Sequence, residues 1–90
     1  MSVRITSISE STGTVLQIAG KLRGEDVGEL EREASAVTGP LVVDVSDLAS
    51  TDAAGAESLK AIAVRGAELR GVSTYLALLL ERGNHRHESR

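Results

Sequence analysis

The chain has 90 residues, which is enough for one domain, and 41% hydrophobic with 26% charged residues is ordinary for a globular protein. Its 13 acidic and 10 basic side chains give a formal net charge of −3 at pH 7, and Tyr75 is the single aromatic residue. Nucleic acid is therefore not an expected partner, because its binding relies on clustered basic residues and on rings that stack against bases. The absence of cysteine excludes disulfides, thiolate catalysis and cysteine-based zinc sites.

The first part of the chain predicts a hairpin followed by a helix. Residues 3–10 alternate between apolar and polar side chains, residues 11–13 read Ser-Thr-Gly, and residues 14–19 resume an apolar alternation. The two glycines of residues 20–24 are expected to end that second strand. Apolar side chains at steps of three and four then predict a helix over residues 25–37, with one face formed by Val27, Leu30, Ala34 and Val37.

The second part alternates strands and helices. Residues 41–45, Leu-Val-Val-Asp-Val, form the continuous apolar run typical of a strand covered on both faces. Asp52 is a natural N-cap for a second helix, whose narrow face holds Ala56, Leu59, Ile62, Ala63 and Gly66. A short strand is expected within residues 67–72. Ser73 or Thr74 is then expected to cap a last helix. Its apolar residues cover more than one face: Tyr75, Leu76, Leu78, Leu79 and Leu80. Some of them are therefore expected to form an exposed apolar surface for a partner or for a homodimer.

The predicted order of elements is β-β-α-β-α-β-α. This order indicates an α/β domain with a mixed four-stranded sheet and about three helices. The domain is expected to span residues 1–82, and the polar residues 83–90 are expected to form a flexible C-terminal tail.

Several segments together resemble the STAS family of regulatory domains. Gly20-Lys21-Leu22 is similar to the G-x-L step after the second strand of that family, and residues 41–48 are similar to its hydrophobic strand and D-x-S segment. Asp52-Ala53-Ala54-Gly55-Ala56 resembles the family's D-S-[ST/A]-G loop, and residues 69–73 with the leucine-rich helix after them match its last strand and helix. The resemblance extends over residues 3–82 and implies a STAS-like fold.

The resemblance implies a non-catalytic module that binds a protein partner. Within that family we expect a member of the branch of bacterial anti-sigma factor antagonists. These proteins regulate transcription by binding an anti-sigma factor with kinase activity. In that branch the kinase phosphorylates a Ser or Thr directly after the loop aspartate. Here the matching positions are Ala53 and Ala54, which carry no hydroxyl, and the weak alternatives are Ser50 and Thr51.

The implied docking surface is the loop and the N-terminal half of the second helix. It comprises Thr51, Asp52, Ala53, Ala54, Gly55, Ala56, Glu57 and Lys60. Residues 1–5 contain no apolar leader, and no apolar run approaches the length of a membrane span, so we expect a cytoplasmic protein without direct membrane insertion. Neither a cofactor nor a metal ion is expected.

Two other functions remain open at the level of sequence. The first, also implied by the resemblance, is a small STAS subunit of an ABC-type lipid transport system, with a transporter component as the partner. The second is a small enzyme or nucleotide-binding domain that uses Asp44, Asp47 and Asp52. In this alternative the three carboxylates bind a magnesium ion, because hard cations prefer carboxylate ligands. Against it, no base, nucleophile or Walker-type glycine pattern accompanies these three residues.

Overall fold

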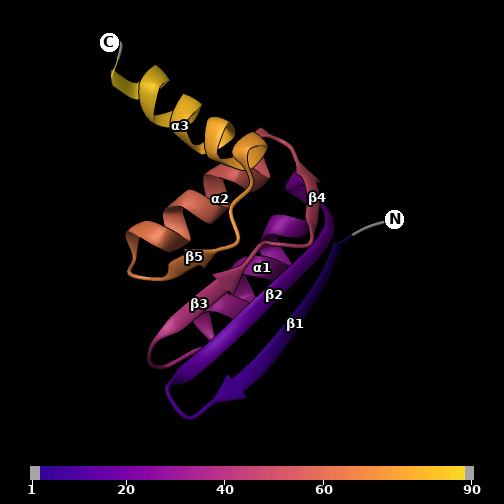
Figure 1. Ribbon diagram of the computed structural model, residues 1–90, viewed down its shortest axis with the longest axis vertical. Coiled ribbons are helices and arrows are strands. Elements are labelled where there is room, and N and C mark those ends of the chain that lie inside the picture. The colour runs from indigo at the N-terminus through magenta and orange to yellow at the C-terminus, as the bar shows by residue number, and fades with distance from the viewer. Residues whose placement is uncertain (1–2, 89–90) are drawn as a thin grey trace.

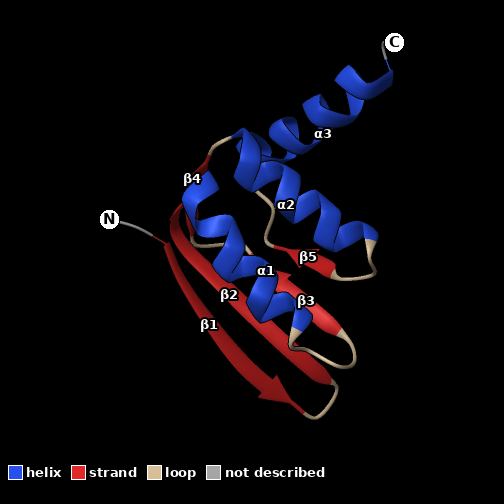
Figure 2. Ribbon diagram, turned by 180° about the vertical axis from the view of Figure 1, so that it is seen from behind, coloured by secondary structure: helices blue, strands red, loops and turns tan. Residues whose placement is uncertain are grey.

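The computed structural model describes residues 3–88, with side chains through Glu81, and shows one mixed sheet of five strands (Figure 1). Helices α1 and α2 lie on the same face of that sheet (Figure 2). The strands are β1 Val3–Glu10, β2 Gly13–Leu22, β3 Leu41–Asp44, β4 Leu48–Thr51 and β5 Glu68–Arg70. The helices are the 3-10 turn η1 Gly24–Asp26, α1 Val27–Ser35, α2 Ala53–Val64 and α3 Thr74–Glu88. The predicted α/β class and the order of the predicted elements are confirmed, with β4 and η1 added.

Strand β2 organises the sheet because it pairs with three other strands. It runs antiparallel to β1 along residues 13–20, parallel to β3 along residues 14–17, and parallel to β4 along residues 20–22. Strand β5 pairs in parallel with β3 and forms the far edge.

The prediction that Gly20 ends the second strand is wrong, and so is the count of four strands. At Gly20, where φ is +92°, the pairing with β4 shifts register between Gly20 and Lys21, and β2 then continues to Leu22. A glycine tolerates this positive φ, so it marks a bulge here and not a strand end. Strand β4 reads Leu-Ala-Ser-Thr, which is too short and polar to be recognised before its partner is known.

The core lies between the sheet and the two helices that cover it. On α1, Leu30 and Ala34 are buried, and on α2 the predicted face is confirmed at Ala56, Leu59 and Ile62. The other members of this core come from the sheet, the β3–β4 connection and α3: Leu16, Ile18, Leu22, Val43, Val45 and Leu76. Gly66 was predicted on the α2 face, but it follows the helix and is exposed.

The prediction that residues 41–45 are covered on both faces is wrong. Val43 is fully buried beneath the helices, whereas Val42 and Asp44 point to the other face and are only half-buried. Among residues 3–88 both α1 and α2 lie on one side, so this second face stays open (Figure 2). The apolar run at residues 41–45 therefore predicted a strand correctly, but it did not predict which faces of that strand are buried.

Helix α3 begins at a capped N-terminus and projects beyond the rest of the domain (Figure 1). The Ser73 hydroxyl accepts a hydrogen bond from the backbone N–H of Leu76 at 3.1 Å, which confirms one of the two predicted caps. Leu76 is buried, whereas Tyr75 is 50% and Leu78 is 59% exposed, so this helix does expose apolar side chains. It continues to Glu88, past the domain boundary predicted at residue 82, and residues 89–90 lie outside the described part. Within residues 3–88 no helix has the length and apolar character needed to cross a membrane.

Candidate functional site

Asp52 fixes the start of α2 with both oxygens of its carboxylate. Oδ1 accepts the backbone N–H of Gly55 at 2.9 Å, which confirms the predicted N-cap, and Oδ2 accepts the backbone N–H of Gly24 at 2.9 Å. The backbone N–H of Asp52 donates to the carbonyl of Leu22 at 3.2 Å. One side chain therefore joins α2 to the loop after β2, a link over 28 positions that the sequence did not reveal.

Gly55 is required by space and not by its backbone angles. A Cβ atom there would lie 2.1 Å from Oγ1 of Thr51 and 2.9 Å from the carbonyl oxygen of Leu22. The first turn of α2 thus packs directly against the end of β2. Thr51 is buried, and its hydroxyl donates to the carbonyl of Asp52 at 3.2 Å. The absence of a side chain at Gly55 therefore permits the close approach of a neighbouring backbone of the same chain.

The residues predicted to bind a partner divide into two groups by exposure. Asp52, Ala53, Ala54 and Glu57 are exposed, and Lys60 is half-buried at their edge; we call these five residues the cap surface. Thr51, Gly55 and Ala56 are buried and support that surface from below. Of the two alternative hydroxyls, Thr51 is therefore covered and Ser50 is half-buried.

Tyr75 on α3 lies beside this region, which sequence reasoning did not foresee. Its hydroxyl donates a long hydrogen bond of 3.5 Å to the carbonyl of Thr51. Half of the Tyr75 side chain remains exposed. Nothing in the local sequence indicates this contact, because it depends on how α3 packs against α2.

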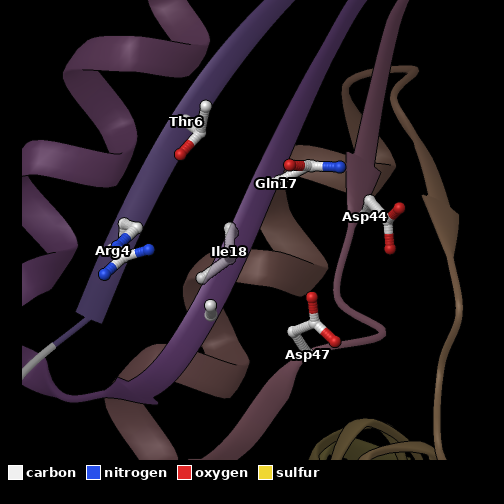
Figure 3. Close-up of a pocket in the computed structure, with 7 residues that line it drawn as sticks. Arg4, Thr6, Gln17, Ile18, Asp44 and Asp47 are labelled. Atoms are coloured by element: carbon white, nitrogen blue, oxygen red, sulfur yellow. The ribbon is translucent and has the colours of Figure 1, made fainter.

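The three aspartates proposed for an enzyme do not converge on one site. Asp44 and Asp47 line a hollow of about 120 Å³ on the open face of the sheet, together with Arg4, Thr6 and Gln17 (Figure 3). Asp52 is absent from that lining and caps α2 instead. No group of three side chains suited to hold a metal ion occurs within the described residues.

Asp44 is engaged in local hydrogen bonds. Its Oδ1 accepts the hydroxyl of Ser46 and also the backbone N–H of Ser46 at 3.0 Å. These bonds, with a smaller contribution from the charge of Arg70, hold the pKa of Asp44 below its usual value. A carboxylate held ionised in this way stabilises the turn between β3 and β4 and is a poor general acid.

The pKa of Asp52 is also lowered, chiefly by the hydrogen bond from Gly55, then by that from Gly24, with a smaller contribution from Arg23. The pKa of Asp52 is therefore lower in the folded chain than in the unfolded chain. At pH values above the pKa in the unfolded chain, the ionised carboxylate stabilises the fold. This contribution is lost as the pH falls through the pKa in the folded chain. We therefore expect Asp52→Asn to lower the free energy of unfolding at pH 7. At pH 3 the difference in free energy of unfolding between this variant and wild type should be smaller. Urea unfolding at both pH values measures this.

Asp47→Asn is the matched control for this experiment, because it removes an exposed carboxylate without removing a helix cap. If the difference in free energy of unfolding between Asp52→Asn and wild type is the same at pH 7 and at pH 3, the ionised carboxylate does not have this role.

Comparison with known proteins supports the fold that this geometry displays. No protein-family model matches the sequence, and no curated protein sequence matches it. Among solved structures, the chain is similar to the crystal structure of an antisigma-factor antagonist, a STAS domain from Rhodobacter sphaeroides, with a TM-score of 0.60 and 20% sequence identity. The match covers 76% of this chain and 83% of the other. The chain therefore has the STAS fold.

Proposed function

We propose that this chain is a non-catalytic binding module of the anti-sigma antagonist type, which docks onto a protein partner in the cytoplasm through the cap surface. The observation that carries the proposal is the combination of small exposed side chains with a backbone that is anchored by hydrogen bonds and close packing at the start of α2. Ala53 and Ala54 leave the helix backbone accessible, while Asp52 and Gly55 hold that backbone in place.

Rigidity favours binding at this position for an energetic reason. A surface that is already ordered loses little conformational entropy when a partner docks, so more of the contact energy appears as affinity. The exposed charge of Glu57 and the half-buried Lys60 border the small residues and supply polar contacts around them. The likeness in fold to an antisigma-factor antagonist supports an anti-sigma factor as the partner.

The same surface supports binding without the phosphorylation switch. A helix N-terminus is a favourable place for a phosphate, but Ala53 and Ala54 have no side-chain hydroxyl that can be phosphorylated. The nearest hydroxyl, that of Thr51, is covered by the packing of α2 on β2. We infer that binding is controlled by the amount of this protein or by the state of its partner.

The test is a binding titration against each anti-sigma factor encoded in the source genome, with wild type and Ala53→Arg. We expect one of them to bind wild type, and Ala53→Arg to weaken that complex by at least about tenfold, because the arginine occupies the centre of the cap surface. Isothermal titration calorimetry measures both affinities.

Ala61→Arg is the matched control, since Ala61 is an exposed alanine in the same helix but outside the cap surface. It should bind as wild type does. Equal affinity of Ala53→Arg and wild type would place the docking site elsewhere. Failure of every anti-sigma factor to bind, with co-purification of an ABC permease instead, would favour the transporter function.

A further inference from the structure

Within residues 3–88, strand β1 forms a long sheet edge whose single pairing partner is β2. It spans the 8 residues Val3–Glu10, contains no proline, and pairs with β2 in a register without a bulge. It lies on the side of the sheet away from α2 and α3, as both views show (Figures 1 and 2). Natural sheets usually protect such an edge with a bulge, a proline or a covering element, because its free backbone groups are a template for another strand.

The residues whose backbone groups face outward follow from the hydrogen bonds of β2. The backbone N–H of Thr14 donates to Pro40 at 3.0 Å and that of Gly20 to Asp47 at 3.2 Å, so both point away from β1. Their partners in β1 are Ser9 and Val3, which are therefore not hydrogen-bonded pairs. Because the pattern alternates along an antiparallel ladder, the N–H and C=O groups at the free edge belong to Val3, Ile5, Ser7 and Ser9.

We propose that a second copy of this chain pairs with this edge, with the two β1 strands antiparallel and related by a two-fold axis at Ser7. In this register Ser7 faces Ser7 of the second copy, and Ile5 faces Ser9, so all outward backbone groups between these positions are paired. The result is one continuous sheet across two copies. The proposal is independent of the proposed function, because the cap surface remains free.

Charge selects this register over its neighbours. Arg4 and Glu10 are exposed at the two ends of β1, and neither forms an ion pair with another described residue. A two-fold axis at Ser7 places Arg4 of each copy directly opposite Glu10 of the other, twice in the dimer. These are non-hydrogen-bonded positions, where side chains are closest, and Thr6 and Ile8 face each other between them. A shift of the axis to Thr6 or Ile8 leaves both charges without that opposite partner.

Charge reversal tests the register. Sedimentation velocity over a concentration series should show a monomer–dimer equilibrium for wild type. Arg4→Glu should weaken the dimer by about tenfold, because it places like charges opposite each other at two positions. The double variant Arg4→Glu with Glu10→Arg should restore the wild-type dissociation constant. A wild-type chain that stays monomeric at millimolar concentration overturns the proposal, and so does a double variant no better than Arg4→Glu.

Cross-linking provides a second measurement, because the chain has no cysteine. Facing residues of a hydrogen-bonded pair have Cα atoms about 5.5 Å apart, within the range of a disulfide. Ser7→Cys should therefore form a covalent dimer under mild oxidation. Ser9→Cys is the control, as an exposed serine on the same strand whose copies would lie roughly 14 Å apart. Equal cross-linking of both variants overturns the proposed axis.

A third variant separates this interface from the exposed apolar side chains of α3. Leu78→Glu places a charge at a side chain that is 59% exposed on that helix. The dimer should persist unchanged in this variant. Dissociation by Leu78→Glu would assign the interface to α3 and overturn the pairing through β1.

Discussion

Gly55→Ala should lower the free energy of unfolding by about 2 kcal/mol, although alanine is the better helix former. The added methyl group would lie 2.1 Å from Oγ1 of Thr51 and 2.9 Å from the carbonyl of Leu22, so the first turn of α2 must move away from β2. Urea unfolding followed by circular dichroism measures the change. For a domain of this size, whose total stability is on the order of 5–10 kcal/mol, the loss is large.

Two further variants identify the cause of the Gly55→Ala effect. At Gly28, in α1, an added Cβ atom has no described atom within 4 Å beyond its chain neighbours and the backbone of its own helix, so Gly28→Ala should be neutral or should stabilise by up to about 1 kcal/mol. Thr51→Ala removes the closest of the clashing atoms, so it should cost less in the Gly55→Ala background than in wild type. Additive effects of Thr51→Ala and Gly55→Ala would show that the clash with the threonine hydroxyl is not the cause.

Leu59→Ala should lower the free energy of unfolding by about 3 kcal/mol. Leu59 is fully buried at the centre of the α2 face that packs on the core. The truncation removes apolar contacts and leaves a cavity, since neighbouring elements relax only in part. The midpoint of urea unfolding should fall while the slope of the transition stays unchanged.

Val64→Ala is the control for Leu59→Ala because it truncates an apolar side chain of the same helix that is 81% exposed. It should change the free energy of unfolding by less than about 0.5 kcal/mol, and in the stabilising direction, because alanine has the higher helix propensity. A loss at Val64 comparable to that at Leu59 would contradict the assignment of the buried face of α2.

The β1–β2 hairpin, the N-cap of α2 and the buried face of α2 were predictable because residues close together in the sequence determine each of them. The β1–β2 hairpin follows from alternation around the turn at residues 11–12, and Asp52 was recognised as an N-cap from its place before an apolar periodic segment. The face of α2 was predicted at Ala56, Leu59 and Ile62, since a helix repeats every 3.6 residues.

Elements defined by a distant partner were missed. Strand β4 exists because residues 20–22 of β2 extend beyond β3 and leave backbone groups for Leu48–Thr51 to pair with. Its own side chains carry little strand signal. The open face of β3 was missed for a related reason, because local propensity does not report which layer covers a strand.

The sequence alone determined the α/β class, the order of most elements, the helix cap at Asp52 and the absence of a hydroxyl at Ala53 and Ala54. These properties depend on residue identity and on periodicity over one or two turns. Only the tertiary structure decided that Thr51, Gly55 and Ala56 are buried beneath the cap surface and that Asp52 also holds Gly24. It likewise separated Asp52, which caps α2, from Asp44 and Asp47, which line a hollow on the open face of the sheet. Burial and long-range hydrogen bonds are set by which elements pack together, and that information is distributed over the whole chain.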